Sequence, residues 1–136
     1  MSRIAASATN SANSDENGLI PADTVYKIVS TEVWIDAVTS GIFQGAAIDI
    51  TDGYIHFSTA DQVQSTLQKH FSGQSNLTLV AVDAQLLVGQ IVYEKAREGE
   101  LFLHLYSPLD MGSVIWSKPL PLGNDDQHEI PELGRH

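Results

Sequence analysis

The chain has 136 residues, with 17 acidic and 7 basic side chains and a net charge of −10. Long nucleic acids are held chiefly by clustered Lys and Arg, so this charge argues against a nucleic-acid partner and favours a small-molecule ligand. The absence of cysteine excludes a disulfide framework, a thiolate nucleophile and a Cys-ligated zinc. No apolar run approaches the roughly 18 residues of a membrane span. We expect a cytoplasmic protein with no membrane partner, because a chain without cysteine suits a reducing compartment.

The length fits one domain between two tails. Residues 1–24 are rich in Ser, Ala and Asn without apolar periodicity, so we expect a disordered N-terminal tail. Residues 123–136 are polar and acidic, and we expect a loose C-terminal tail there. The intervening residues 25–122 are enough for a single globular domain with one modest core and one site.

The first half of this domain predicts two strand-helix units. A strand is expected over residues 25–29, followed by a helix in "STEVWIDAVTSG", residues 30–41. A second strand is expected over residues 53–58. Thr59 and Gln62 then form a capping-box pattern, which predicts that a second helix begins there.

The second half predicts mainly strands. Residues 77–82 form a nearly continuous apolar strand, and "DAQLLVGQ" is compatible with one short helical turn. Three further strands are expected in close succession, in "IVYEKA", "LFLHLY" and "SVIWSKPL". Helices come early and strands late, which favours an α+β fold over alternating βαβ units.

Two of the expected strands carry a histidine among aromatic side chains. Strand alternation gives each strand such a face, Tyr54, His56 and Ser58 in the first and Phe102, His104 and Tyr106 in the second. A face that only meets water would be charged or rich in Thr. Aromatic side chains beside a histidine suit a cleft that stacks a planar ring and hydrogen-bonds a ribose or a phosphate.

The repetition predicts that the two faces line one concave site, with the imidazoles of His56 and His104 close enough to share a ligand. The alternative is that both histidines are ordinary structural residues. In that interpretation each imidazole is buried with its own hydrogen-bond partner in the protein.

Three blocks, "YKIVSTEVWIDAVTSG", "DGYIHFSTADQV" and "LFLHLYSPLD", resemble in this order the family known as domain of unknown function 952. The resemblance spans roughly residues 25–120, and the block around His56 is its most specific part. By fold, the family is placed with the ADP-ribosyltransferase-like superfamily. The resemblance therefore implies a split arrangement of two small antiparallel sheets, with two main helices around a cleft that holds NAD in active members.

The resemblance also implies roles for single residues. Lys27 stands where relatives often have a histidine; it could reach a phosphate as a point charge, but it cannot accept a hydrogen bond. His56, Ser58 and Thr59 match the second motif as ligand-binding residues. Thr59 has a structural alternative as a helix N-cap. Glu94 is the first candidate for the superfamily's catalytic glutamate.

Two function hypotheses of different class remain open, and Lys27 favours the first. The first is a nucleotide or small-ligand binding module. The second is an NAD-dependent ADP-ribosyltransferase or NAD glycohydrolase, with Glu94 and His56 as catalytic residues and, for a transferase, a protein acceptor. No cofactor is certain, and NAD is a possible ligand or substrate. The residues expected to contact the ligand are Lys27, Tyr54, His56, Ser58, Thr59, His104 and Tyr106. A metal site of His56, His104 and Glu94 is a third alternative, without close sequence spacing to support it.

Overall fold

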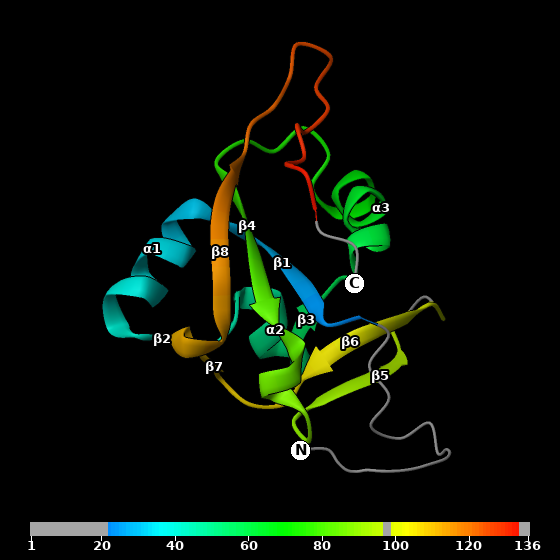
Figure 1. Ribbon diagram of the computed structural model, residues 1–136. Coiled ribbons are helices and arrows are strands. Elements are labelled where there is room, and N and C mark those ends of the chain that lie inside the picture. Colours follow the sequence, from blue (N-terminus) through cyan, green and yellow to red (C-terminus); the bar gives the residue numbers. More distant parts are fainter. Residues whose placement is uncertain (1–21, 97–98, 134–136) are drawn as a thin grey trace.

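The computed structural model describes residues 22–96 and 99–133 (Figure 1). The elements are β1 (Thr24–Ser30), α1 (Thr31–Ser40), β2 (Ile42–Phe43), α2 (Ala47–Asp52), β3 (Ile55–Phe57), α3 (Ala60–His70), β4 (Leu77–Asp83), η1 (Ala84–Leu87), β5 (Ile91–Lys95), β6 (Leu101–Leu105), β7 (Leu109–Asp110), η2 (Met111–Ser113) and β8 (Val114–Leu120). The predicted α+β class is confirmed. No helix in the described part of the chain is long and apolar enough to cross a membrane.

The described strands form three small antiparallel sheets. Two have three strands, in the orders β1-β4-β8 and β3-β6-β5, and β2 pairs with β7 in a third. The expectation of two sheets missed this short third pair. Tyr26 and Ser58 exchange two backbone hydrogen bonds of 2.8 Å, which join the two larger sheets at β1 and β3. This bridge places Lys27 of β1 near His56 of β3.

The two longer helices lie where the sequence predicted them. The Ser30 hydroxyl accepts a hydrogen bond from the Val33 N–H at 3.2 Å, and Gly41 ends α1 with a φ of 90°. Thr59 is the N-cap of α3, where the Gln62 side chain accepts from the Thr59 N–H at 3.0 Å. Thr59 therefore has the structural role that was its alternative.

Apolar side chains pack on both faces of the sheet that contains β1 and β4. One cluster includes Val80 and Val82 with residues of α1, β2, β3 and β6. The other includes Leu79 and Ala81 with Val63 and Leu67 of α3. Because β4 is buried on both faces, its sequence is a continuous apolar run instead of an alternating one.

Helix α2 was not predicted, because its pattern is the reverse of an ordinary amphipathic helix. Ile48 and Ile50 are 51% and 67% exposed, whereas Asp49 is buried. Gly53 ends the helix with a φ of 89°, a conformation that suits glycine. This short helix carries two carboxylates of the candidate site, Asp49 and Asp52.

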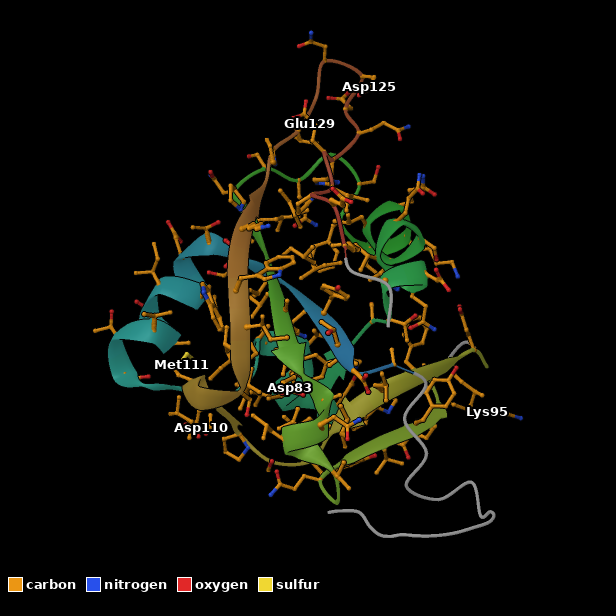
Figure 2. The ribbon with its side chains drawn as sticks, viewed as in Figure 1. Asp83, Lys95, Asp110, Met111, Asp125 and Glu129 are labelled. Atoms are coloured by element: carbon orange, nitrogen blue, oxygen red, sulfur yellow. The ribbon has the colours of Figure 1, made fainter. Side chains whose placement is uncertain are left out.

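The first 21 residues of the expected N-terminal tail lie outside the described residues, and Thr24 already belongs to β1. Residues 123–133 differ from the expected loose tail, because they return to the domain beside α3 (Figure 1). Ile130 and Leu133 pack against the cluster under α3, and the His128 Nε2 lies 2.7 Å from the carbonyl oxygen of Gln74. Figure 2 shows the acidic side chains that dominated the sequence pattern, such as Asp125, on the loop beyond β8.

A chain that ends at residue 122 is expected to be less stable than one that ends at residue 133. Loss of the Ile130 and Leu133 contacts should lower the free energy of unfolding by roughly 1 to 3 kcal/mol. Urea denaturation of the two truncated chains measures the difference. Equal midpoints would show that the segment contributes nothing to the domain.

Candidate functional site

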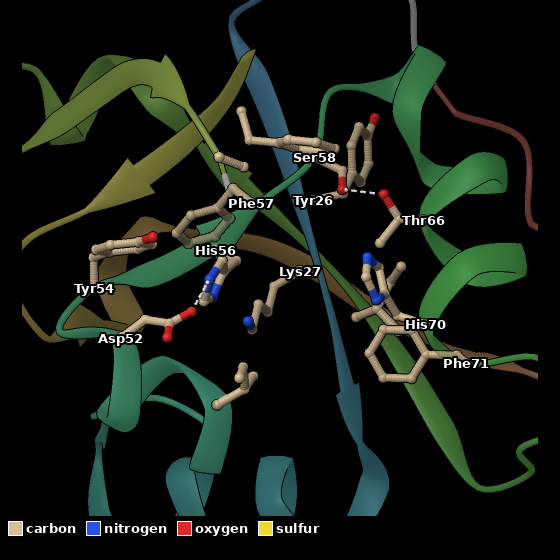
Figure 3. Close-up of a pocket in the computed structure, with 14 residues that line it drawn as sticks. Tyr26, Lys27, Asp52, Tyr54, His56, Phe57, Ser58, Thr66, His70 and Phe71 are labelled. Atoms are coloured by element: carbon tan, nitrogen blue, oxygen red, sulfur yellow. Dashed lines mark hydrogen bonds and ion pairs between the residues drawn. The ribbon is translucent and has the colours of Figure 1, made fainter. Parts of the chain in front are cut away.

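A pocket with a volume of about 390 Å³ opens among β1, α2, β3 and α3 (Figure 3). Its walls are largely apolar and aromatic, and they include Tyr26, Tyr54, Phe57, Phe71 and Phe102. The polar lining residues are Lys27, Asp52, His56, Ser58, Thr66 and His70. Figure 3 shows Lys27, Asp52 and His56 on one side, across from Thr66 and His70 of α3. A pocket of this kind can hold a planar ring and orient its polar substituents.

Basic and acidic side chains alternate in a row of four, called here the charge chain: Lys27, Asp49, His56 and Asp52. Three of them line the pocket, and Asp49 is buried in contact with two of these three. The Lys27 Nζ lies 2.8 Å from the Asp49 Oδ2, and the Asp49 Oδ1 lies 2.5 Å from the His56 Nδ1. The His56 Nε2 lies 2.9 Å from the Asp52 Oδ2. The His56 ring therefore lies between two carboxylates, with one ring nitrogen directed at each.

Asp49 makes the largest number of hydrogen bonds in the charge chain. Besides Lys27 and the His56 ring, it accepts hydrogen bonds from the backbone N–H groups of Ala46 at 2.8 Å and His56 at 3.2 Å. Burial raises the pKa of Asp49, but the hydrogen bond from His56 and the charge of Lys27 outweigh burial and lower the pKa to about 2. Burial lowers the pKa of Lys27, and the carboxylate of Asp49 opposes that shift.

Asp49 should make the free energy of unfolding depend on pH in the acid range. Its pKa in the folded state is about 2, below the ordinary 3.8. Its contribution is therefore complete above the ordinary value and is lost as the pH falls through about 2. Urea denaturation at a series of pH values should show a shallower acid loss for Asp49→Asn than for the wild type. If the free energy of unfolding falls equally with pH in the two proteins, Asp49 is not the source of the acid loss.

A second group of side chains, called here the aromatic stack, consists of Tyr54, His104, Tyr106 and Glu94. The Tyr54 ring stacks on the His104 ring, with centroids 4.0 Å apart and planes at 22°. The His104 Nδ1 lies 2.7 Å from the Glu94 Oε2, to which the Tyr106 hydroxyl also donates. His104 is fully buried, and its Nε2 has no hydrogen-bond partner in the described part of the chain.

The titration behaviour of the aromatic stack follows from burial and from these hydrogen bonds. Burial lowers the pKa of His104, although Glu94 opposes the shift, so the neutral ring is favoured, with its proton on Nδ1. Burial raises the pKa of Glu94, but hydrogen bonds from Tyr106 and His104 lower it overall. The bond to Glu94 raises the pKa of Tyr106 to about 12. The His104 Nε2 is therefore a buried, unpaired acceptor, which costs about 1 to 3 kcal/mol.

The residues expected at one site fall into three places. Lys27, Tyr54, His56 and Ser58 line the pocket, and the Ser58 Oγ lies 3.1 Å from the Thr66 Oγ1. Glu94, His104 and Tyr106 are not among the lining residues. Thr59 lies at the start of α3, also outside the lining.

The two imidazoles are neighbours, since His56 and His104 pair directly across β3 and β6 with centroids 5.5 Å apart. The expectation that both face one cavity is nevertheless wrong for His104, which is fully buried, is not among the lining residues of the pocket and has Glu94 as its partner. The expected position of Glu94 beside a reacting sugar is also not found, because its carboxylate is occupied by His104 and Tyr106.

Sequence reasoning missed four lining or supporting residues, Asp49, Asp52, Thr66 and His70. One signal for the first two was present. Asp49 and Asp52 are three residues apart, a spacing that puts both carboxylates on one face of a helix, immediately before the strand that carries His56.

Among the described residues, no group of three or more His, Cys, Asp or Glu side chains is arranged to hold a metal ion. This finding goes against the metal alternative. The ring nitrogens of His56 already face two carboxylates, and the Glu94 carboxylate is bound to the Nδ1 of His104.

Comparison with known proteins identifies the family. A family described as "Protein of unknown function (DUF952)" matches residues 28–117. The chain belongs to the DUF952 family. The matched range includes Asp49, His56 and His104, while Lys27 lies one residue before it.

This DUF952 member is also similar to solved structures of the protein CC0527 from Caulobacter crescentus. An X-ray structure of CC0527 shares 40% sequence identity and a TM-score of 0.73, over 78% of this chain and 93% of that chain. A solution NMR structure of CC0527 gives a TM-score of 0.72 at the same identity, over 78% of this chain and 91% of that one. No curated protein matches the chain.

Proposed function

We propose that this protein binds a small nucleotide-like ligand in the pocket, with NAD or one of its parts as the leading candidate. The observation that carries the proposal is the combination, in one pocket, of aromatic walls with the charge chain. Aromatic walls suit a planar base or nicotinamide ring, and convergent polar groups suit the hydroxyls of a ribose. The proposal also includes an ADP-ribosyltransferase-like arrangement, with which two three-stranded sheets beside a pocket are compatible.

The size of the pocket selects the part of the ligand that it holds. Small-molecule sites usually have volumes of about 300 to 1,000 Å³, so about 390 Å³ is at the small end. A base or nicotinamide with its ribose fits this description better than a complete dinucleotide. Asp52 can accept hydrogen bonds from ribose hydroxyls, and the hydroxyls of Ser58 and Thr66 can do so or donate.

The charges lead to the same conclusion. Lys27 and His56 are the basic side chains of the charge chain, and each lies against a carboxylate of the protein, Asp49 or Asp52. The charge chain therefore brings little net positive charge to a pyrophosphate. We place the ring and ribose inside the pocket and the phosphates of a dinucleotide toward its mouth.

Cleavage of NAD is a second candidate function, favoured by the position of Asp52. Its carboxylate belongs to the pocket lining, whereas that of Glu94 does not. A carboxylate there could stabilise positive charge that develops at the anomeric carbon as nicotinamide leaves. Water as the acceptor would make the protein an NAD glycohydrolase, and a protein acceptor would make it an ADP-ribosyltransferase.

A thermal-shift experiment with NAD, ADP-ribose, nicotinamide and adenosine tests the proposal. A ligand at 100 times its Kd should stabilise the folded state by about 2.7 kcal/mol and raise the Tm accordingly. His128→Ala, which replaces a half-buried histidine outside the pocket, should respond like the wild type. No shift with any of the four compounds would contradict the proposal, and a shift with zinc alone would favour the metal alternative. Release of nicotinamide from NAD then separates an enzyme from a binding protein.

A further inference from the structure

Tyr54 lines the pocket, and its side chain is held in place by other rings. Its ring contacts those of His104, His56 and Tyr106, with centroids 4.0, 4.9 and 5.3 Å away. No hydrogen bond of the Tyr54 hydroxyl is found within the described residues. The position of this part of the pocket wall therefore depends on how firmly the three neighbouring rings are fixed.

Each of the three rings is fixed by a carboxylate. The His104 Nδ1 lies 2.7 Å from the Glu94 Oε2, and the Tyr106 hydroxyl donates to the same oxygen. The His56 ring lies between the two carboxylates of the charge chain. Glu94 therefore orients two of the three rings around Tyr54, although it is not itself a lining residue of the pocket.

His104 is the ring that covers a face of Tyr54. It is fully buried, and its plane lies 22° from that of Tyr54, so it forms a fixed backing for the Tyr54 ring. The hydrogen bond to Glu94 sets the rotation of the imidazole, a restraint that an apolar side chain in its place would lack. This orientation is kept although the Nε2 has no partner in the described part of the chain, which lowers stability. Such a local cost is typical of residues that serve a functional site.

We propose that Glu94 and His104 are positioning residues of the pocket, which act on the ligand through the ring of Tyr54. Glu94 orients His104, His104 backs Tyr54, and Tyr54 presents an ordered ring to the ligand. Binding then does not include the entropy loss of ordering this side chain. The inference deepens the proposed function and rests on it for the identity of the ligand. It gives a role at the pocket to two residues that the sequence predicted as direct contacts and that lie outside the lining.

The hold on Tyr54 can be measured without a ligand, by NMR relaxation of the tyrosine ring carbons. The Tyr54 ring should have an order parameter near the rigid value of about 0.85 in the wild type and below about 0.6 in His104→Leu and Glu94→Ala. His104→Leu keeps a buried apolar side chain but removes the ring. Glu94→Gln, whose carbonyl oxygen still accepts from His104, should behave like the wild type. Tyr93 lies on the opposite face of β5 from Glu94 and should be unchanged in every variant.

A double-mutant cycle tests whether the two residues act through Tyr54. Isothermal titration calorimetry uses whichever of the four compounds raises the Tm of the wild type, with NAD first. His104→Leu and Glu94→Ala should each raise the Kd about 3- to 10-fold, because the ligand must then order the Tyr54 side chain. Glu94→Gln should keep the wild-type Kd. In a Tyr54→Leu background, His104→Leu should change the Kd less than about 2-fold, since the group through which it acts is gone.

Three results would overturn the positioning role. They are a Tyr54 ring as ordered in the folded variants as in the wild type, an unchanged Kd in a variant whose Tyr54 ring is mobile, and an equal loss of affinity with and without the Tyr54 ring. Where His104→Leu does not fold, Glu94→Ala replaces it in both experiments, because the Glu94 side chain is 34% exposed.

The two experiments also separate this inference from the proposed function. If a compound binds but the Tyr54 ring is equally ordered in every folded variant, the pocket stands and the positioning role is wrong. If the ring measurements come out as expected but none of the four compounds binds, Glu94 and His104 hold Tyr54 and the proposed ligand class is wrong.

Discussion

Replacement of Asp49 by alanine is expected to lower the free energy of unfolding by about 3 to 5 kcal/mol, because it leaves a buried charge without its partner. The side chains of Lys27 and Asp49 are 6% and 1% exposed, with an N···O distance of 2.8 Å. The substitution also removes acceptors from the His56 ring and from two backbone N–H groups. Urea denaturation at neutral pH measures the loss.

The chain offers a matched control for this prediction. Lys69 and Glu100 form an exposed pair at 3.8 Å, with side chains 51% and 45% exposed. Lys69→Ala should change the free energy of unfolding by about 0 to 1 kcal/mol. A double replacement, Lys27→Met with Asp49→Leu, should recover part of the loss, because it removes both buried charges together. A loss below 1 kcal/mol in Asp49→Ala would show that the charge chain is not a structural element.

His56→Ala is expected to weaken the binding of the NAD-related ligand about 10- to 100-fold, because the imidazole lines the pocket and positions Asp52, whose carboxylate accepts hydrogen bonds from the ligand. Its side chain is 31% exposed and lines the pocket. Its loss should therefore disturb folding less than the loss of Asp49. Isothermal titration calorimetry with whichever compound raises the Tm measures the change in Kd.

His128→Ala is the matched control, since it makes the same substitution outside the pocket and should leave the Kd unchanged. Unchanged affinity in His56→Ala, together with a loss of stability as large as that of Asp49→Ala, would make His56 a structural residue only. The charge chain would then support the fold without contacting a ligand.

Sequence alone could predict the α+β class and the main elements of the domain. The two longer helices have clear caps and apolar faces, and the buried strands have strong apolar patterns. Strand alternation also predicts correctly that His56 and His104 lie on one face, where they pair across β3 and β6. Caps and apolar faces are local features, and the faces of a strand follow from the alternation of side chains at every second residue. Both can therefore be predicted directly from the sequence.

The ion pairs of the site could not be predicted, because they depend on α2, a helix whose sequence lacks the usual amphipathic pattern. Lys27 was expected as a free point charge for a phosphate, but a buried lysine needs a partner, and its partner Asp49 comes from α2. The surroundings of His104 include the ring of Tyr54, which lies just before β3 and stacks on His104 of the neighbouring strand. Both features arise from tertiary contacts that no short stretch of sequence contains.

An NMR titration of the full chain with nicotinamide and with NAD tests most directly whether the pocket beside the charge chain is a ligand site. The account predicts saturable shifts of the backbone amide signals at four lining residues of the pocket, His56 of β3, Ser58 just after it, Thr66 of α3 and Phe102 of β6. In His56→Ala the same shifts should require higher ligand concentrations. Shifts confined to the outer face of α1, or no shifts with either compound, would contradict the account.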